Sequence, residues 1–281
     1  MVANQAPKGR LAYILGLARR RVVQGLNMID RLRRKWAYGQ TRTQRTRLVA
    51  QGDSWFCYPL WTRQDMLWHL QSSLNYAVRT LAGAGRTSAK MVTKAELAAL
   101  RRLIETERPA AVLLSAGGND LLHIMNMRPA RARDAGLAFV PDPEGSYIHD
   151  SDVKTVLAEV EENLHCLIQT ARDAGASKII LVGYDYPNVG NWTQGSIHQS
   201  LQHVDAPCAK FQQIADALLD RLFAVQRRVA EAYAEVIYMP LTGVCGDHTD
   251  WKDEAHPHTE GFLKAAQHLV GNAEFPKAER G

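Results

Sequence analysis

The segment Arg47-Leu-Val-Ala-Gln-Gly-Asp-Ser54-Trp-Phe-Cys-Tyr-Pro59 holds the motif from which we interpret the rest of the chain. Its apolar run at 48–50 has the length of a buried strand rather than a helix, and Gly52 bounds it. In an open α/β sheet, ligands bind beyond the carboxyl ends of the strands, where this turn would present the Ser54 hydroxyl. Gly52 allows a sharp bend, and the Asp53 side chain can hydrogen-bond within the turn. Because any strand-ending turn prefers Gly, Asp and Ser, the stretch needs support from the rest of the chain.

Two later motifs supply that support. A second apolar run at 111–116 ends in a Gly-Gly-Asn119-Asp turn, and Asp253-Glu-Ala-His256-Pro257 places an acid and an imidazole three residues apart. In this order, the three motifs make the chain resemble the SGNH (GDSL-type) hydrolase family over residues 46–272. The resemblance implies a serine esterase or acylhydrolase that needs no cofactor.

The chemistry of the proposed triad follows from its residue types. A serine hydroxyl is a poor nucleophile until a base takes its proton, and His256 is the candidate base for Ser54. Asp253 would hold the imidazole in the required tautomer, with Pro257 stiffening the loop. No G-x-S-x-G elbow surrounds Ser54, which favours the SGNH interpretation over the α/β-hydrolase one.

The oxyanion of an acyl-transfer intermediate needs hydrogen-bond donors. The candidates are the backbone N–H of Ser54, the side-chain amide of Asn119 and, by resemblance to the family, a glycine N–H after the second strand. Gly85, in Gly85-Arg-Thr87, fits the family pattern best, and Gly83 stays open as an alternative. A turn without chemistry is the competing interpretation for both glycines.

Strand-like and helix-like segments alternate along the chain. We expect helices at 64–70, 93–108 (with a capping box from Thr93 to Glu96), 151–174, 207–234 and from Thr259, and strands at 48–50, 74–78, 111–116, 178–183 and 235–239. This alternation predicts parallel βαβ units in a three-layer α/β/α sandwich. The family resemblance adds a five-stranded, flavodoxin-like strand order.

Aromatic residues accompany the candidate site. Trp55 and Phe56 follow the nucleophile, and Tyr184 and Trp192 belong to a long connection at 184–206. A second long connection covers 121–150, and long loops in compact domains are typically functional. These four aromatic residues could wall an apolar acyl or aryl site, or they could simply pin the loops to the body.

The basic charge of the chain is concentrated at its start. Residues 1–48 hold twelve of the 34 Lys/Arg and one of the 29 Asp/Glu, so 22 basic and 28 acidic residues remain elsewhere. Apolar residues recur at helical spacing over 9–37, which predicts a basic amphipathic helix. We therefore divide the chain into an N-terminal arm at 1–45 and a catalytic domain at 46–281. The arm could dock on the body or a sister subunit, lie on an anionic membrane surface, or bind nucleic acid, for which it lacks a reader motif.

Composition limits the other possibilities. No apolar run approaches the roughly 20 residues of a membrane span, and no secretory signal is recognisable, which together favour the cytoplasm. The four cysteines follow no disulfide or zinc pattern. A metal site from His248, Asp250 and His258 is conceivable, but no helix-face spacing such as H-E-x-x-H supports it.

The sequence thus predicts a carboxylic ester hydrolase acting through an acyl-enzyme. Lipid esters, acetylated sugars and small acyl esters or thioesters are not separable at this point, although the amphipathic arm favours a lipid substrate. The alternative from another class is a non-catalytic membrane- or partner-binding protein on the same fold, acting through its basic helix.

Overall fold

The computed structural model describes most of the chain after the arm. The described residues are 25, 35, 38–40, 43–58, 64–125, 150–191, 196–201, 208–246 and 251–278. The predicted arm helix at 9–37 therefore lies outside the described residues, apart from Gly25 and Lys35. Trp192, His248 and Asp250 lie outside them as well.

A five-stranded parallel sheet forms the centre of the molecule, in the order β2-β1-β3-β4-β5. The strands are β1 (Arg47–Gln51), β2 (Ala77–Thr80), β3 (Ala111–Leu114), β4 (Ile179–Val182) and β5 (Val236–Met239). Every residue of β3 and β4 is buried, as expected for strands covered on both faces. The predicted three-layer sandwich and flavodoxin-like strand order are confirmed.

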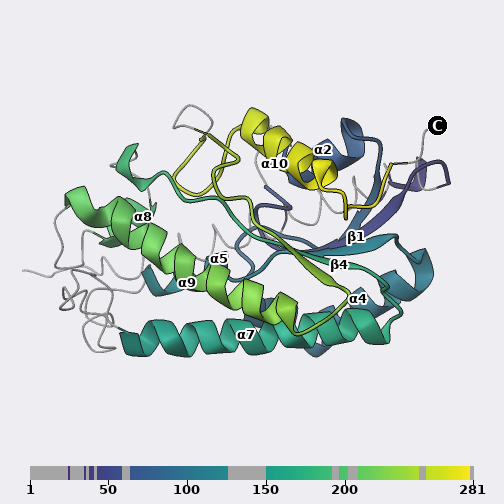
Figure 1. Cartoon of the computed structure of the whole chain (residues 1–281), viewed down its shortest axis with the longest axis horizontal. Coiled ribbons are helices and arrows are strands. Elements are labelled where there is room, and N and C mark those ends of the chain that lie inside the picture. Colours follow the sequence, from purple (N-terminus) through teal and green to yellow (C-terminus); the bar gives the residue numbers. More distant parts are fainter. Residues whose placement is uncertain are drawn as a thin grey trace, which may run out of the picture.

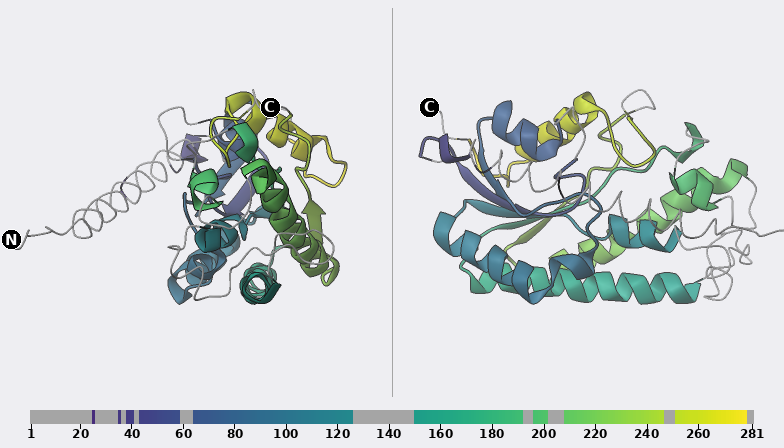
Figure 2. Two further views of the ribbon diagram at one scale, coloured as in Figure 1. Left: turned by 90° about the vertical axis from the view of Figure 1, so that its left-hand side faces the viewer. Right: turned by 180° about the vertical axis from the view of Figure 1, so that it is seen from behind.

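Helices cover both faces of this sheet. The helical segments are α2 (Met66–Ser72), α3 (Ser88–Met91), α4 (Lys94–Glu107), α5 (Gly118–Met125), α7 (Asp150–Asp173), η1 (Val189–Asn191), α8 (Ser196–Leu201), η2 (Cys208–Lys210), α9 (Phe211–Glu231) and α10 (Thr259–Gly271). In Figure 1, α2 and α10 lie together above the sheet, and α4 and α7 lie below it. Figure 2 shows the same layering from behind, with α7 running along the lower face.

Two local predictions are wrong. The second strand begins at Ala77 rather than at residue 74, because Asn75 has a left-handed backbone (φ 65°) and the Tyr76 N–H bonds back to the Leu70 carbonyl. The capping box at Thr93 does not form, since the Thr93 side chain makes no cap hydrogen bond. The Glu96 carboxylate instead lies 2.9 Å from the Arg86 guanidinium.

Three short helices were not expected from the sequence. α3, α5 and α8 fall in segments that we had assigned to loops, and α5 begins at Gly118, immediately before Asn119. Helix α5 therefore occupies the start of the long connection at 121–150. Among the described residues, no helix is long and apolar enough to cross a membrane.

Candidate active site

The candidate residues gather at the carboxyl edge of the sheet. Ser54 follows β1, Asn119 follows β3, and Tyr184 follows β4. Because the chain leaves β1 toward β2 on one side and β3 lies on the other, this edge contains the topological switch point where α/β proteins bind ligands.

The turn that carries Ser54 is held by close packing. Gly52 does not adopt a positive φ, so the sharp bend that we predicted is not the reason for glycine here. A Cβ at Gly52 would lie 2.6 Å from the Phe56 ring and 3.2 Å from the Ser115 carbonyl oxygen. The Asp53 side chain accepts a hydrogen bond from the Trp55 N–H at 3.1 Å, as predicted for this turn.

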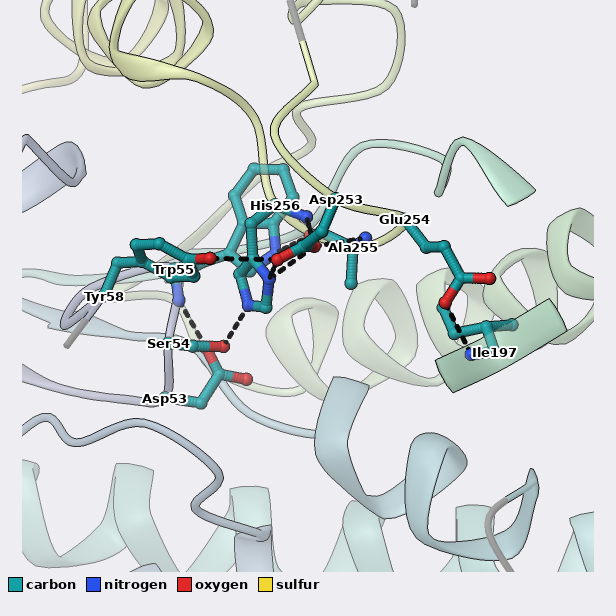
Figure 3. A network of polar contacts seen from close by, with 9 residues as sticks. All are labelled: Asp53, Ser54, Trp55, Tyr58, Ile197, Asp253, Glu254, Ala255 and His256. Carbon is teal, nitrogen blue, oxygen red and sulfur yellow. Dashed lines mark hydrogen bonds and ion pairs between the residues drawn. The ribbon is translucent and has the colours of Figure 1, made fainter. Parts of the chain in front are cut away.

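Ser54, His256 and Asp253 form a continuous hydrogen-bonded chain (Figure 3). The Ser54 Oγ lies 2.7 Å from the His256 Nε2, and the His256 Nδ1 lies 2.8 Å from the Asp253 Oδ1. Ser54 and His256 are 202 positions apart in the sequence, so the fold alone brings them together. His258, the competing imidazole, is exposed at the N-cap of α10.

The loop that carries Asp253 and His256 is closed on itself. Trp251 and Pro257 form an antiparallel bridge, and the Lys252 N–H donates to the His256 carbonyl at 2.9 Å. The indole of Trp55 donates to the Ala255 carbonyl at 3.1 Å, which ties the nucleophile turn to this loop. The separation between Ser54 and His256 is therefore fixed from both ends.

The charge state of Asp253 determines the tautomer of His256. Although burial opposes it, hydrogen bonding and charge interaction with His256, together with the Ala255 N–H and the Tyr58 hydroxyl, lower the pKa of Asp253 to about 2. An ionised carboxylate only accepts hydrogen bonds, so the proton must sit on the His256 Nδ1. The His256 Nε2 lone pair then faces the Ser54 hydroxyl, the arrangement that a general base requires.

A second buried aspartate lies beneath the nucleophile. Asp53 is 1% exposed, and burial raises its pKa to about 6. Its Oδ2 accepts a hydrogen bond from the Tyr184 hydroxyl at 2.7 Å, and the Gly118 N–H donates to the same Tyr184 oxygen at 3.3 Å. Asp53 and Tyr184 thus link the Ser54 turn to the start of α5, beside Asn119.

A largely apolar cavity opens next to Ser54 and His256. It encloses about 530 Å³, counted with its opening to solvent, and Trp55, Asn119 and Tyr184 contribute to its lining. Beyond them the wall is mostly aliphatic, made of Leu121, Leu122, Ile197, Ala215, Leu218 and Leu219, with Asp185 as a further polar residue of the lining. Trp55 and Tyr184 line this space, so their predicted contact with a substrate stays a prediction. Phe56, by contrast, is fully buried in the core, with its ring against Gly52.

The two glycine candidates for the oxyanion lie outside the described lining of this cavity. The Gly83 N–H donates to the Gly52 carbonyl at 3.1 Å, and Gly85 is exposed with φ 68°. Next to them, the Asp120 carboxylate accepts from the Ser88 N–H at 2.9 Å and from the Ser88 hydroxyl at 2.8 Å. The turn after Gly85 is thereby tied to α5, while a role for Gly85 in binding the oxyanion stays a prediction.

Sequence reasoning missed three polar contacts of this site. Tyr58 donates to Asp253, Tyr184 donates to Asp53, and Glu254 accepts from the Ile197 and His198 N–H groups at 2.5 Å each. Glu254 points away from the triad toward Ile197 in Figure 3. Each contact joins residues 56 or more positions apart, and no local pattern signals such pairs. Among the described residues, no group of three His, Cys, Asp or Glu could hold a metal ion.

Comparisons with known proteins give structural likenesses only. No protein-family model and no curated protein matches the chain. Phospholipase A1 from Streptomyces albidoflavus NA297 aligns at 16% identity and TM-score 0.49, over 81% of this chain and 99% of that one. A member of the lipolytic protein G-D-S-L family from Veillonella parvula DSM 2008 aligns at 14% identity and TM-score 0.46, over 81% and 97%. The Clostridium thermocellum family 3 carbohydrate esterase aligns at 13% identity and TM-score 0.43, over 80% and 94%. Likenesses at this level do not identify a reaction, so the function has to be argued from the site.

Proposed function

We propose that this chain is a serine hydrolase of the SGNH type that cleaves carboxylic esters through an acyl-enzyme. The observation that carries the proposal is the unbroken contact from the Ser54 Oγ through His256 to Asp253, with 2.7 Å and 2.8 Å between the bonded atoms. A nucleophile, a base and a group that orients the base are the parts that acyl transfer requires.

The proposed reaction has two halves. His256 Nε2 takes the Ser54 proton as the Ser54 Oγ bonds to the ester carbonyl carbon, and the resulting oxyanion faces the Ser54 N–H and the Asn119 amide. Collapse of the intermediate breaks the bond to the alcohol oxygen, which leaves with the proton from His256. Water then attacks the acyl-enzyme in the same manner, with His256 again taking and returning the proton, and releases the carboxylic acid.

The aliphatic wall of the cavity supports an apolar acyl group as the preferred substrate portion. An acetyl group would leave most of this wall in contact with water, whereas each methylene of a longer chain that it buries contributes about 0.8 kcal/mol. Esters with a hydrocarbon acyl chain are therefore the proposed substrates, ahead of acetylated sugars.

A fluorophosphonate probe tests the reaction class. The wild-type protein should be labelled at Ser54, and Ser54→Ala should not be labelled. Ser177→Ala is a matched control, because Ser177 is exposed before β4, at the opposite edge of the sheet. If the intact protein resists labelling, the hydrolase proposal fails. A series of p-nitrophenyl esters from acetate to palmitate tests the substrate class, and the highest kcat/KM at acetate would contradict it.

We also propose that the basic arm docks on the body of the protein. Tyr38 is 3% exposed, its hydroxyl donates to Glu107 at 2.5 Å, and the Arg79 guanidinium lies 5.5 Å from its ring. These contacts support docking at the end of the arm nearest the body. Pelleting of the full-length protein with anionic liposomes, lost on deletion of residues 1–34, would instead favour a membrane role.

A further inference from the structure

Tyr58 contacts both the acid and the base of the proposed triad. Its hydroxyl donates to the Asp253 Oδ2 at 2.9 Å, and its ring centroid lies 4.6 Å from that of His256. Tyr58 is four residues beyond Ser54, so one turn carries the nucleophile and a donor to the acid. In Figure 3 the Tyr58 hydroxyl and the His256 ring approach Asp253 from different sides.

The backbone of Tyr58 is itself fixed by a buried carboxylate. The Tyr58 N–H donates to the Asp65 Oδ2 at 3.1 Å, while the Asp65 Oδ1 accepts from the Trp68 N–H and caps α2. Asp65 is fully buried. The backbone of Tyr58 is therefore anchored in the core of the protein, independently of the loop that carries Asp253.

Tyr58 supplies Asp253 with a hydrogen-bond donor from outside the loop that carries Asp253. The Asp253 Oδ1 accepts from the Ala255 and His256 N–H groups of its own loop, at 2.9 Å each, and from the His256 ring. The Oδ2 accepts from the Tyr58 hydroxyl at 2.9 Å and lies 3.0 Å from the His256 Nδ1, so Tyr58 is the donor to this oxygen from outside the loop. Because burial and the Asp253 charge raise the pKa of Tyr58, the phenol stays protonated and remains a donor. A donor on each oxygen prevents the carboxylate from turning about its bond.

We infer that Tyr58 is a positioning residue that acts through Asp253, holding the carboxylate in the plane of the His256 imidazole. This inference rests on the proposed hydrolase function. Tyr58 is not among the residues that line the cavity beside Ser54, so we expect its effect in the chemical step and not in substrate binding. Other charged groups near Tyr58, Asp253 and His256 include Lys252, whose ammonium lies 4.9 Å from the Tyr58 ring centroid, Asp53 and Glu254.

Tyr58→Phe tests the inference, because it keeps the ring and removes the donor. A hydrogen bond to an ionised group is worth about a factor of ten or more, so we expect kcat to fall roughly tenfold with KM unchanged. The acid limb of the kcat/KM profile should move to higher pH, since a carboxylate without this donor attracts the imidazole proton more strongly. Tyr76→Phe is the control, because the Tyr76 hydroxyl donates to the Pro276 carbonyl before β2, at the opposite edge of the sheet.

A double-mutant cycle shows whether Tyr58 acts through Asp253. In the Asp253→Asn background, adding Tyr58→Phe should change the rate of fluorophosphonate labelling less than twofold. A full tenfold loss in that background, or a Tyr58→Phe profile that matches Tyr76→Phe, would overturn the inference.

A measurement that needs no catalytic activity tests the positioning role of Tyr58 separately from the proposed hydrolase function. The NMR resonance of the proton between His256 and Asp253 should shift in Tyr58→Phe and not in Tyr76→Phe. If the wild-type protein neither hydrolyses esters nor reacts with the probe, the proposed function fails while this measurement still decides the role of Tyr58. An unchanged resonance in Tyr58→Phe would refute the positioning role directly.

Discussion

Asp53→Asn removes a carboxylate whose ionised form is destabilised by burial. Asp53 is buried directly beside the proposed nucleophile, and burial raises its pKa from the ordinary 3.8 to about 6. Asparagine has nearly the same shape and keeps an oxygen for the Trp55 N–H. The Tyr184 hydroxyl, which donates to the Asp53 Oδ2 at 2.7 Å, would instead have to accept a hydrogen bond from the new amide NH2 group.

The raised pKa of Asp53 determines how the free energy of unfolding depends on pH. The folded state holds the Asp53 proton more tightly than the unfolded state does, so this group stabilises the fold most below about pH 4. That contribution is lost as the pH rises through about 6. A shift of about two units corresponds to roughly 3 kcal/mol over the whole window, of which about 1.4 kcal/mol lies between pH 5 and pH 8.

Urea unfolding of wild type and Asp53→Asn at pH 5 and pH 8 measures this difference. Relative to wild type, the variant should be more stable at pH 8 than at pH 5 by about 1.4 kcal/mol. Asp173→Asn serves as the control, because the Asp173 side chain is 48% exposed. If Asp53→Asn changes the free energy of unfolding equally at both pH values, Asp53 is ionised in the fold without strain, and the reasoning is refuted.

Three further substitutions, one of them with a matched control, test the site and its surroundings. Asn119→Ala should lower kcat roughly 100-fold with little change in KM, because its amide is proposed to bind the oxyanion, and an equal rise in KM would contradict that role. Gly52→Ala should cost about 1–3 kcal/mol in urea unfolding, because its Cβ would meet the Phe56 ring at 2.6 Å. Gly190→Ala, whose Cβ would meet nothing closer than 3.9 Å, should be near neutral by the same measurement. Ala215→Leu fills the aliphatic end of the cavity, so the ratio of kcat/KM for octanoate over acetate esters should fall about tenfold, and an unchanged ratio would place the acyl chain elsewhere.

The strands and the long helices were predictable because each is signalled locally. The run at 48–50 lies in β1, the runs at 111–116 and 178–183 contain β3 and β4, and the helical spacing at 151–174 became α7 (Asp150–Asp173). The order of the strands came from the family resemblance and not from periodicity. A local pattern gives a wrong prediction where a side chain finds a partner outside its own helix. Glu96 pairs with Arg86 instead of capping its own helix.

The sequence predicted that Ser54, His256 and Asp253 lie close together, but it did not predict the hydrogen bonds that hold them there. The family resemblance named the three residues, and Ser54 directly follows β1 at the carboxyl edge of the sheet. Asp253 and His256 lie in the long connection from β5 to α10, which begins at the same edge. The contacts of Tyr58 with Asp253 and of Tyr184 with Asp53 join positions 195 and 131 residues apart. Nothing in the neighbourhood of either tyrosine distinguishes it from an aromatic residue of the core, so these contacts required coordinates.

The two aspartates of the site illustrate why position in the sequence does not assign the role of a carboxylate. Asp53 adjoins the nucleophile, yet burial raises its pKa to about 6. Asp253 lies 199 positions from Ser54 and its side chain is 41% exposed, and His256, backbone N–H groups and Tyr58 lower its pKa to about 2. A carboxylate that orients an imidazole must stay ionised while the imidazole gains and loses its proton, and Asp253 meets this requirement. Asp53 would take up a proton near pH 6. The opposite environments therefore favour Asp253 as the acid of the proposed triad and leave Asp53 to hold the turn.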